Sequence, residues 1–243
     1  MGSVLEPGTV FADEPTAWLG YLERRTRHTV GARCAAAGLV VVGRRTGDVL
    51  EVGTVLKGED VGTVDLPPVP RDFDGSEALS PSVHDGERAL VFAVDRQTLL
   101  DRPGATVGEL TTDDLDAQVE AATWFVGLPD GVDARVRALV DGADDDNPAT
   151  ASSALRALGD EGHTAATTDL MTVAIASDAA AVAAVLAAVA LWLLDERARA
   201  GAALAGTVDR LGRDRFLDLW GVREAPDDPA TLVGPDPDVR PYA

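Results

Sequence analysis

The feature that most constrains the fold of this chain is an uninterrupted apolar run from Ala179 to Leu194. Asp178 is the one charged residue between Met171 and the end of that run. A helix that is apolar all round either fills the centre of a helical bundle, spans a membrane or forms an interface between subunits. A membrane span needs about 20 strongly apolar residues, and much of this run is alanine, which contributes little to insertion. The pattern therefore favours a buried helix over a membrane span at 171–194.

This helix could also be buried against neighbouring subunits rather than within one chain. In that case its larger side chains are interface candidates. Small alanine faces would let a helix of a second subunit approach closely. The interface candidates are Val182, Val185, Leu186, Val189 and Trp192. On this interpretation the partners are other copies of the chain in a homo-oligomer, or other protein subunits.

The chain is also strongly acidic, with 41 Asp and Glu against 21 Lys and Arg and a net charge of −20, and Lys57 is its only lysine. Such an excess destabilises a compact chain through self-repulsion in dilute buffer. In about 1 M salt the Debye length falls to about 3 Å, and the repulsion is screened. The composition resembles that of haloarchaeal cytosolic proteins; the alternative is an acidic protein from a GC-rich genome. Because Met1 to Val10 has no signal-peptide pattern, we expect a high-salt cytoplasm or a particle assembled there.

One local concentration of basic residues stands against this acidic background. A net charge of −20 repels nucleic acid and anionic lipid, so nucleic-acid binding is expected only at a local basic patch. The candidates for anion or nucleic-acid contact are Arg24, Arg25, Arg27, His28, Arg44 and Arg45. Arginine forks grip phosphates, but they also pair with carboxylates, which this chain has in abundance. We favour the second interpretation.

The sequence carries no recognisable catalytic or cofactor motif. His28, His84 and His163 lie far apart in unrelated contexts, and Cys34 is the only cysteine. Neither a metal site nor a disulfide is therefore expected. No Gly-rich phosphate loop and no nucleophile elbow is present. Catalytic residues stay unknown, no cofactor is expected, and a non-enzymatic role is favoured.

Hydrophobic periodicity predicts an α+β fold, with a small antiparallel β-sheet or barrel and flanking helices in the N-terminal part and an all-α C-terminal part. The expected elements are a helix over 13–37 whose middle is weakened at Thr29-Val30-Gly31, a three-stranded meander over 39–66 and a strand over 88–94. A helix over 111–128 and further helices from residue 130, including a long one over 177–205, are expected after them. The expected domains are an α/β, barrel-like domain over 1–129, a helical domain over 130–224 and an extended tail over 225–243.

One stretch, within residues 88–128, resembles the end of MazF/PemK-type toxins. It comprises Val94-Asp95-Arg96-Gln97-Thr98-Leu99, then Val107-Gly108-Glu109-Leu110, then Thr111 to Leu128. In that family a strand leads into such a connection, and an amphipathic helix follows that closes on Gly-Leu. The resemblance implies a small β-barrel endoribonuclease that dimerises. No position of this sequence matches the family's catalytic arginine and hydroxyl.

Three classes of function follow from these patterns. The favoured one is a non-enzymatic assembly or interaction protein, such as a scaffold or a viral structural component, of a halophilic archaeon or its virus. The second is a MazF/PemK-like endoribonuclease or RNA-binding protein. The third is a protein attached to a membrane through 171–194, and a membrane is the least expected partner.

Overall fold

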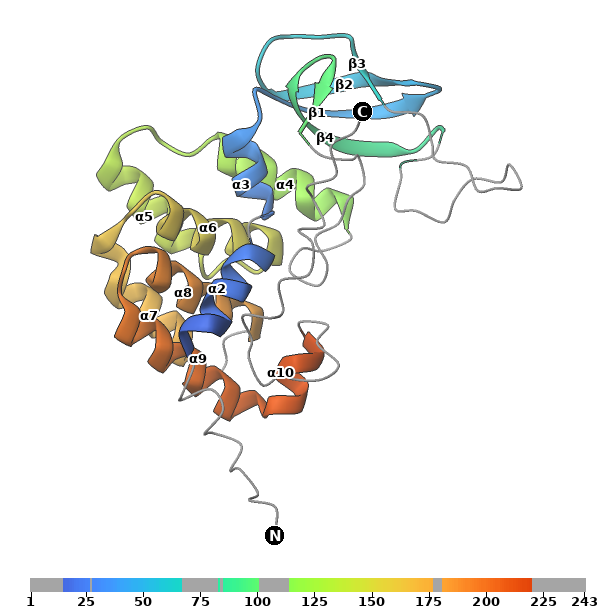
Figure 1. Cartoon of the computed structure of the whole chain (residues 1–243). Coiled ribbons are helices and arrows are strands. Elements are labelled where there is room, and N and C mark those ends of the chain that lie inside the picture. Colours follow the sequence, from blue (N-terminus) through green and yellow to red (C-terminus); the bar gives the residue numbers. More distant parts are fainter. Residues whose placement is uncertain are drawn as a thin grey trace. The chain divides into compact units, whose positions relative to one another are not determined.

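The computed structural model describes residues 15–26, 28–66, 83, 85–100, 114–176 and 181–219. They form two compact units (Figure 1). The helical unit comprises the described residues of Met1–Arg27, Pro129–Asp145 and Ala154–Ala243, and the sheet unit comprises those of His28–Leu128 and Asp146–Ser153. Segments that are far apart in the sequence therefore fold together within each unit.

The sheet unit contains a five-stranded antiparallel sheet, built from strands rich in valine and leucine. Its strands are β1 (Leu39–Thr46), β2 (Val49–Lys57), β3 (Thr63–Asp65), β4 (Arg88–Asp95) and β5 (Thr98–Leu99). They lie in the order β3-β2-β1-β4-β5, and each neighbouring pair is antiparallel. The expected meander over 39–66 and the expected strand over 88–94 are thus confirmed.

The sheet curls toward a barrel. The backbone N–H of Asp65, at the end of β3, donates to the carbonyl of Arg96 in the turn between β4 and β5, with an N···O distance of 3.0 Å. This bond joins β3, at one end of the sheet order, to the β4–β5 turn at the other end. Alternate residues of the strands point inward, as a half-buried sheet requires. The buried core inside the curl comprises Leu39, Val41, Leu50, Val64, Leu66, Val83, Ala89, Val91 and Ala93.

Two helices of the sheet unit, α3 (Val30–Ala36) and α4 (Leu115–Val126), pack against each other and against β4 (Figure 1). Gly31 makes the close approach possible, because a Cβ there would lie 2.6 Å from the ring of Phe125. Its N–H donates to the Ser153 hydroxyl at 2.8 Å. The buried guanidinium of Arg33 lies over the ring of Phe92, 5.6 Å from its centroid. The expected α+β fold with a barrel-like sheet and flanking helices is confirmed.

The expected single helix over 13–37 is wrong, since the chain forms two helices there, α2 (Pro15–Arg25) and α3. Thr29 interrupts the helical path. Its backbone is extended (φ −62°, ψ 157°), and its hydroxyl accepts a hydrogen bond from the N–H of Ala32. Threonine is a favoured N-cap because its side chain satisfies an N–H that has no partner within the helix. That cap starts a new helix.

The helical unit is built around α8 (Ala181–Leu193). Helices α7 (Thr167–Ile175), α9 (Arg197–Leu211) and α2 pack on it. The other elements of the unit are α5 (Val132–Gly142), the second part of α6 (Pro148–Asp160), the 3₁₀ helix η2 (Thr164–Ala166) and α10 (Arg213–Leu219). Every residue from Ala184 to Leu191 is fully buried, so the apolar run fills the centre of this unit. No described helix combines the length and the apolar character that a membrane span requires.

The expected long helix over 177–205 is broken after α8. Asp195 has a left-handed backbone (φ 63°), which ends one helix, and α9 starts two residues later. Aspartate tolerates this conformation better than most side chains. Its carboxylate also accepts a hydrogen bond from Nε of Arg197 at 2.7 Å.

Lys57, the only lysine of the chain, caps the end of α3. Its Nζ donates to the carbonyl oxygens of Cys34 at 2.7 Å and of Ala37 at 2.6 Å. The last carbonyls of a helix lack partners within the helix and carry partial negative charge. Burial raises the pKa of the Cys34 thiol to about 12, against the lowering effect of Lys57, so this thiol stays protonated and unreactive.

Lys57→Met is expected to lower the free energy of unfolding by about 1–2 kcal/mol, because the carbonyls of α3 lose a charged donor while an apolar stem remains. Lys57→Arg keeps the charge and is expected to lose less. Urea unfolding followed by circular dichroism in about 1 M KCl measures both variants with charge repulsion screened. Equal stability of the methionine variant and the wild type would contradict the capping role.

Candidate functional site

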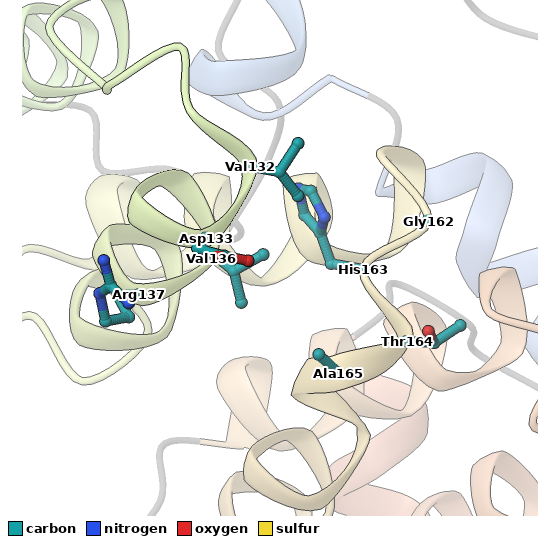
Figure 2. A pocket seen from close by; sticks show the side chains of 8 residues that line it. All are labelled: Val132, Asp133, Val136, Arg137, Gly162, His163, Thr164 and Ala165. Carbon is teal, nitrogen blue, oxygen red and sulfur yellow. The ribbon is translucent and has the colours of Figure 1, made fainter.

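The described surface of the helical unit has a hollow of about 290 Å³ beside the start of α5. Two segments line it. The lining residues are Val132, Asp133, Val136 and Arg137 of α5, and Gly162, His163, Thr164 and Ala165 of the turn after α6 and the start of η2. Figure 2 shows Val132 and Arg137 on α5 and His163 on the turn after α6. The hollow is therefore made by one helix and one turn of the same unit.

The start of α5 presents two short rows of side chains to this hollow. Residues four apart on a helix are neighbours on its surface, so Val132 adjoins Val136 and Asp133 adjoins Arg137. Val132 is 67% exposed and Val136 is half-buried. Asp133 and Arg137 are both exposed. The surface therefore has an apolar row beside a charged row.

The wall opposite α5 is held by three hydrogen-bonded side chains. Nε and Nη2 of Arg135 each donate to one oxygen of the Glu161 carboxylate at 2.6 Å. Nε2 of His163 lies 2.8 Å from the same carboxylate. Burial raises the pKa of Glu161, but the hydrogen bonds from Arg135 and His163 lower it by more, so this pKa lies below its ordinary value. Gly162, with φ 73°, makes the tight turn between Glu161 and His163.

This arrangement fixes which imidazole nitrogen of His163 faces Glu161. An ionised carboxylate only accepts hydrogen bonds, so Nε2 of His163 is the donor to Glu161. The imidazole side chain is 11% exposed. Across the ranges that the structure describes, no three His, Cys, Asp or Glu side chains come close enough to hold a metal ion. The hollow offers an apolar row and two opposite charges.

Glu161→Gln is expected to lower the free energy of unfolding by about 1 kcal/mol near neutral pH, because Arg135 loses its charged partner and the partly exposed pair is screened by solvent. The lowered pKa of Glu161 means that the stabilisation is complete above about pH 4.5 and is lost as the pH falls through the folded-state value. The difference in stability between wild type and variant is therefore expected to shrink below pH 4.5. Urea unfolding as a function of pH measures it. A difference that stays constant, or grows, in acid would contradict this role for Glu161.

No family model, no curated protein and no solved structure matches this chain.

The candidate basic residues are distributed over both units. Arg24 is exposed on α2 of the helical unit, and His28 is half-buried in the sheet unit. Arg25 lies at the end of α2, its side chain is outside what the structure describes, and so is all of Arg27. The described positions of these residues do not test the expected anion or nucleic-acid contact, which stays a prediction.

Arg44 and Arg45, at the end of β1, bind loop carbonyls of the sheet unit. Nη1 of Arg44 donates to the carbonyl of Gly86. The buried Arg45 donates from Nε to the carbonyl of Gly47 at 2.8 Å and from Nη1 to that of Val83 at 3.2 Å. Consecutive strand residues point to opposite sides, which explains why one arginine is exposed and the other is buried. Both help to hold the segment before β4.

The interface candidates of the apolar run lie on α8. Val185, Leu186 and Val189 are fully buried within a single copy of the helical unit. Val182 and Trp192 are partly exposed, and the guanidinium of Arg197 lies 3.6 Å from the centroid of the Trp192 ring. Their role between subunits stays a prediction.

Sequence reasoning missed the residues of the hollow. The sequence alone marks His163 as no part of a metal site, and it does not single out Val132 or Val136. A signal was present in the repeat of Val-Asp and Val-Arg four residues apart, Val132-Asp133 and Val136-Arg137. The opposite wall could not be inferred, since the turn at Gly162 is brought to α5 by the tertiary fold.

Proposed function

We propose that this chain is a non-enzymatic assembly protein that self-associates into a homo-oligomer, as a scaffold or viral structural component of a halophilic archaeon or its virus. The observation that carries the proposal is the start of α5, where the strongly exposed Val132 and the half-buried Val136 adjoin the exposed charges of Asp133 and Arg137. An apolar centre with a charged rim is the usual anatomy of a protein interface.

The acidic composition determines the ionic strength at which copies of this chain can associate. Two chains that each carry a net charge of −20 repel one another at low ionic strength. In about 1 M salt the Debye length is about 3 Å, so charges in direct contact still interact while the long-range repulsion is screened. Self-association is therefore expected in a high-salt cytoplasm or in a particle assembled there.

Size-exclusion chromatography with light scattering tests this proposal. The wild-type protein is applied at increasing concentration in about 1 M KCl, and absorbance at two wavelengths reports any co-purifying nucleic acid. The proposal predicts a defined mass above the 25.3 kDa of one chain, without nucleic acid. A species of 25.3 kDa at every concentration contradicts self-assembly.

A second candidate function is RNA binding or cleavage of the MazF/PemK type. The curled sheet with β4, β5 and α4 in that order supports it, because the resemblance falls on residues 88–128. Within it, the carboxylate of Asp95 accepts from the N–H groups of Gln97 and Thr98 and so holds the β4–β5 turn. This candidate predicts bound RNA in the chromatography, and RNA cleavage that is lost when Arg24, Arg25 and Arg27 are neutralised together. Intact RNA after prolonged incubation with the wild type counts against cleavage.

A further inference from the structure

We propose that two copies of this chain bind each other through the start of α5 in a two-fold symmetric, antiparallel contact. In it Val132 and Val136 of one copy pack on the same residues of the other, and Asp133 of each copy pairs with Arg137 of the other. The proposal rests on the proposed function, since it names the surface and the partner of the self-association.

The spacing of the four residues makes this surface self-complementary. When two identical helices pack antiparallel, the same flank of each helix faces its counterpart, with the direction reversed. Asp133 and Arg137 lie one turn apart on the same flank of α5. In the antiparallel pair, Asp133 of each copy therefore faces Arg137 of the other copy. Both contacts become opposite-charge pairs along that flank, and the valine rows meet beside them. A two-fold interface requires such self-complementarity.

The third charged side chain near the start of α5, that of Arg135, already forms an ion pair within the helical unit. Arg135 points to the opposite wall, where its fork binds Glu161. Within the part of the chain that the structure describes, no ion pair involves Asp133 or Arg137. The two charges that would cross the contact are thus those that the unit itself leaves exposed.

The opposite wall leaves room for a second helix. Two of its residues, Gly162 and Ala165, are small and exposed, and a Cβ at Gly162 would meet nothing within 4 Å. A partner helix that follows the valine row can therefore approach the hollow without meeting a large side chain at these positions. Since the contact involves only the first turns of α5, the expected affinity is that of a small interface, weaker than that of standard-sized complexes.

Reciprocal charge reversal tests the contact. Asp133→Arg and Arg137→Asp are prepared separately, and their folding is checked by circular dichroism. Self-association is then measured by sedimentation velocity at the lowest KCl concentration at which the wild type is folded and associates. Each variant alone is expected to associate about tenfold more weakly, because like charges then oppose across the contact. An equal mixture is expected to recover wild-type association, because the arginines of one variant face the aspartates of the other.

The design separates this contact from general charge effects. The two reversals change the net charge in opposite directions, so net charge cannot explain a loss in both. Asp209→Arg, at an exposed position of α9, changes the net charge as Asp133→Arg does and is expected to leave association intact or stronger. Wild-type association with no response to either reversal overturns the α5 contact alone. A wild type that stays a monomer under every condition overturns both this contact and the proposed function.

Discussion

Replacing Arg156 with methionine is expected to lower the free energy of unfolding by about 3 kcal/mol, because it removes the buried central member of an ion-pair network. The Arg156 side chain on α6 is only 6% exposed. Its guanidinium donates to both carboxylate oxygens of Asp160, to the carboxylate and the carbonyl of Glu23, and to the hydroxyl of Thr26. Every nitrogen of the fork is used, and the variant leaves the buried Thr26 hydroxyl and the largely buried Glu23 carboxylate short of a donor.

Arg199→Met is the matched control for this change. Arg199 pairs with Glu196 at 3.3 Å, but the two side chains are 53% and 38% exposed. Exposed pairs contribute less than about 1 kcal/mol, so this variant is expected to unfold close to wild type. For a chain of this length, each kcal/mol of unfolding free energy shifts the melting temperature by about 2–4 °C. Thermal unfolding in high salt therefore distinguishes Arg156→Met from Arg199→Met. Equal melting temperatures for the two variants would mean that the Arg156 network does not stabilise the helical unit.

Gly43→Ala is expected to cost about 3 kcal/mol, through overpacking at the centre of the sheet. Gly43 lies in β1, the strand between β2 and β4. A Cβ at this position would overlap the carbonyl oxygen of Glu51 and lie 2.8 Å from Cγ of Leu50. A glycine within a strand often marks such a close approach of a second backbone. The added methyl can be accommodated only if β1 and β2 separate.

Gly53→Ala provides the control within the same strand pair. Gly53 belongs to β2, and a Cβ there would lie 3.7 Å from the carbonyl oxygen of Val42, an ordinary contact. Neither glycine has a positive φ, so backbone conformation does not distinguish them. Gly53→Ala is expected to change the free energy of unfolding by no more than about 0.5 kcal/mol. Urea unfolding measures both variants, and a loss of stability at Gly53 as large as at Gly43 would refute the close-approach argument.

Local patterns predicted the meander, β4 and the buried helix, but they predicted neither β5 nor that the helices end at Thr29 and Asp195. Alternation of valine with small or polar residues is enough to predict the meander over 39–66, and the run of Ala, Val and Leu is enough to predict a central helix. The interruptions at Thr29 and Asp195 are different. Each depends on one residue leaving the helical conformation inside a sequence that is otherwise compatible with one helix, and a cap competes with helix continuation by a small free energy.

The basic residues show a similar limit for the site. The sequence places Arg44 and Arg45 side by side, and only the strand geometry shows that their donors bind the carbonyls of Gly47, Val83 and Gly86. The hollow at α5 combines a local pattern, which the sequence displays, with a turn at Gly162 that only the tertiary fold brings to it.

Sedimentation equilibrium of the wild-type chain over a series of KCl concentrations tests the central claim of self-assembly most directly. Between about 0.1 M and about 1 M KCl the Debye length falls from about 10 Å to about 3 Å. Repulsion between copies of net charge −20 is then screened, while the apolar contact of Val132 and Val136 persists. The account predicts a reversible oligomer whose association constant rises with KCl. A single species of 25.3 kDa across the whole series would contradict it.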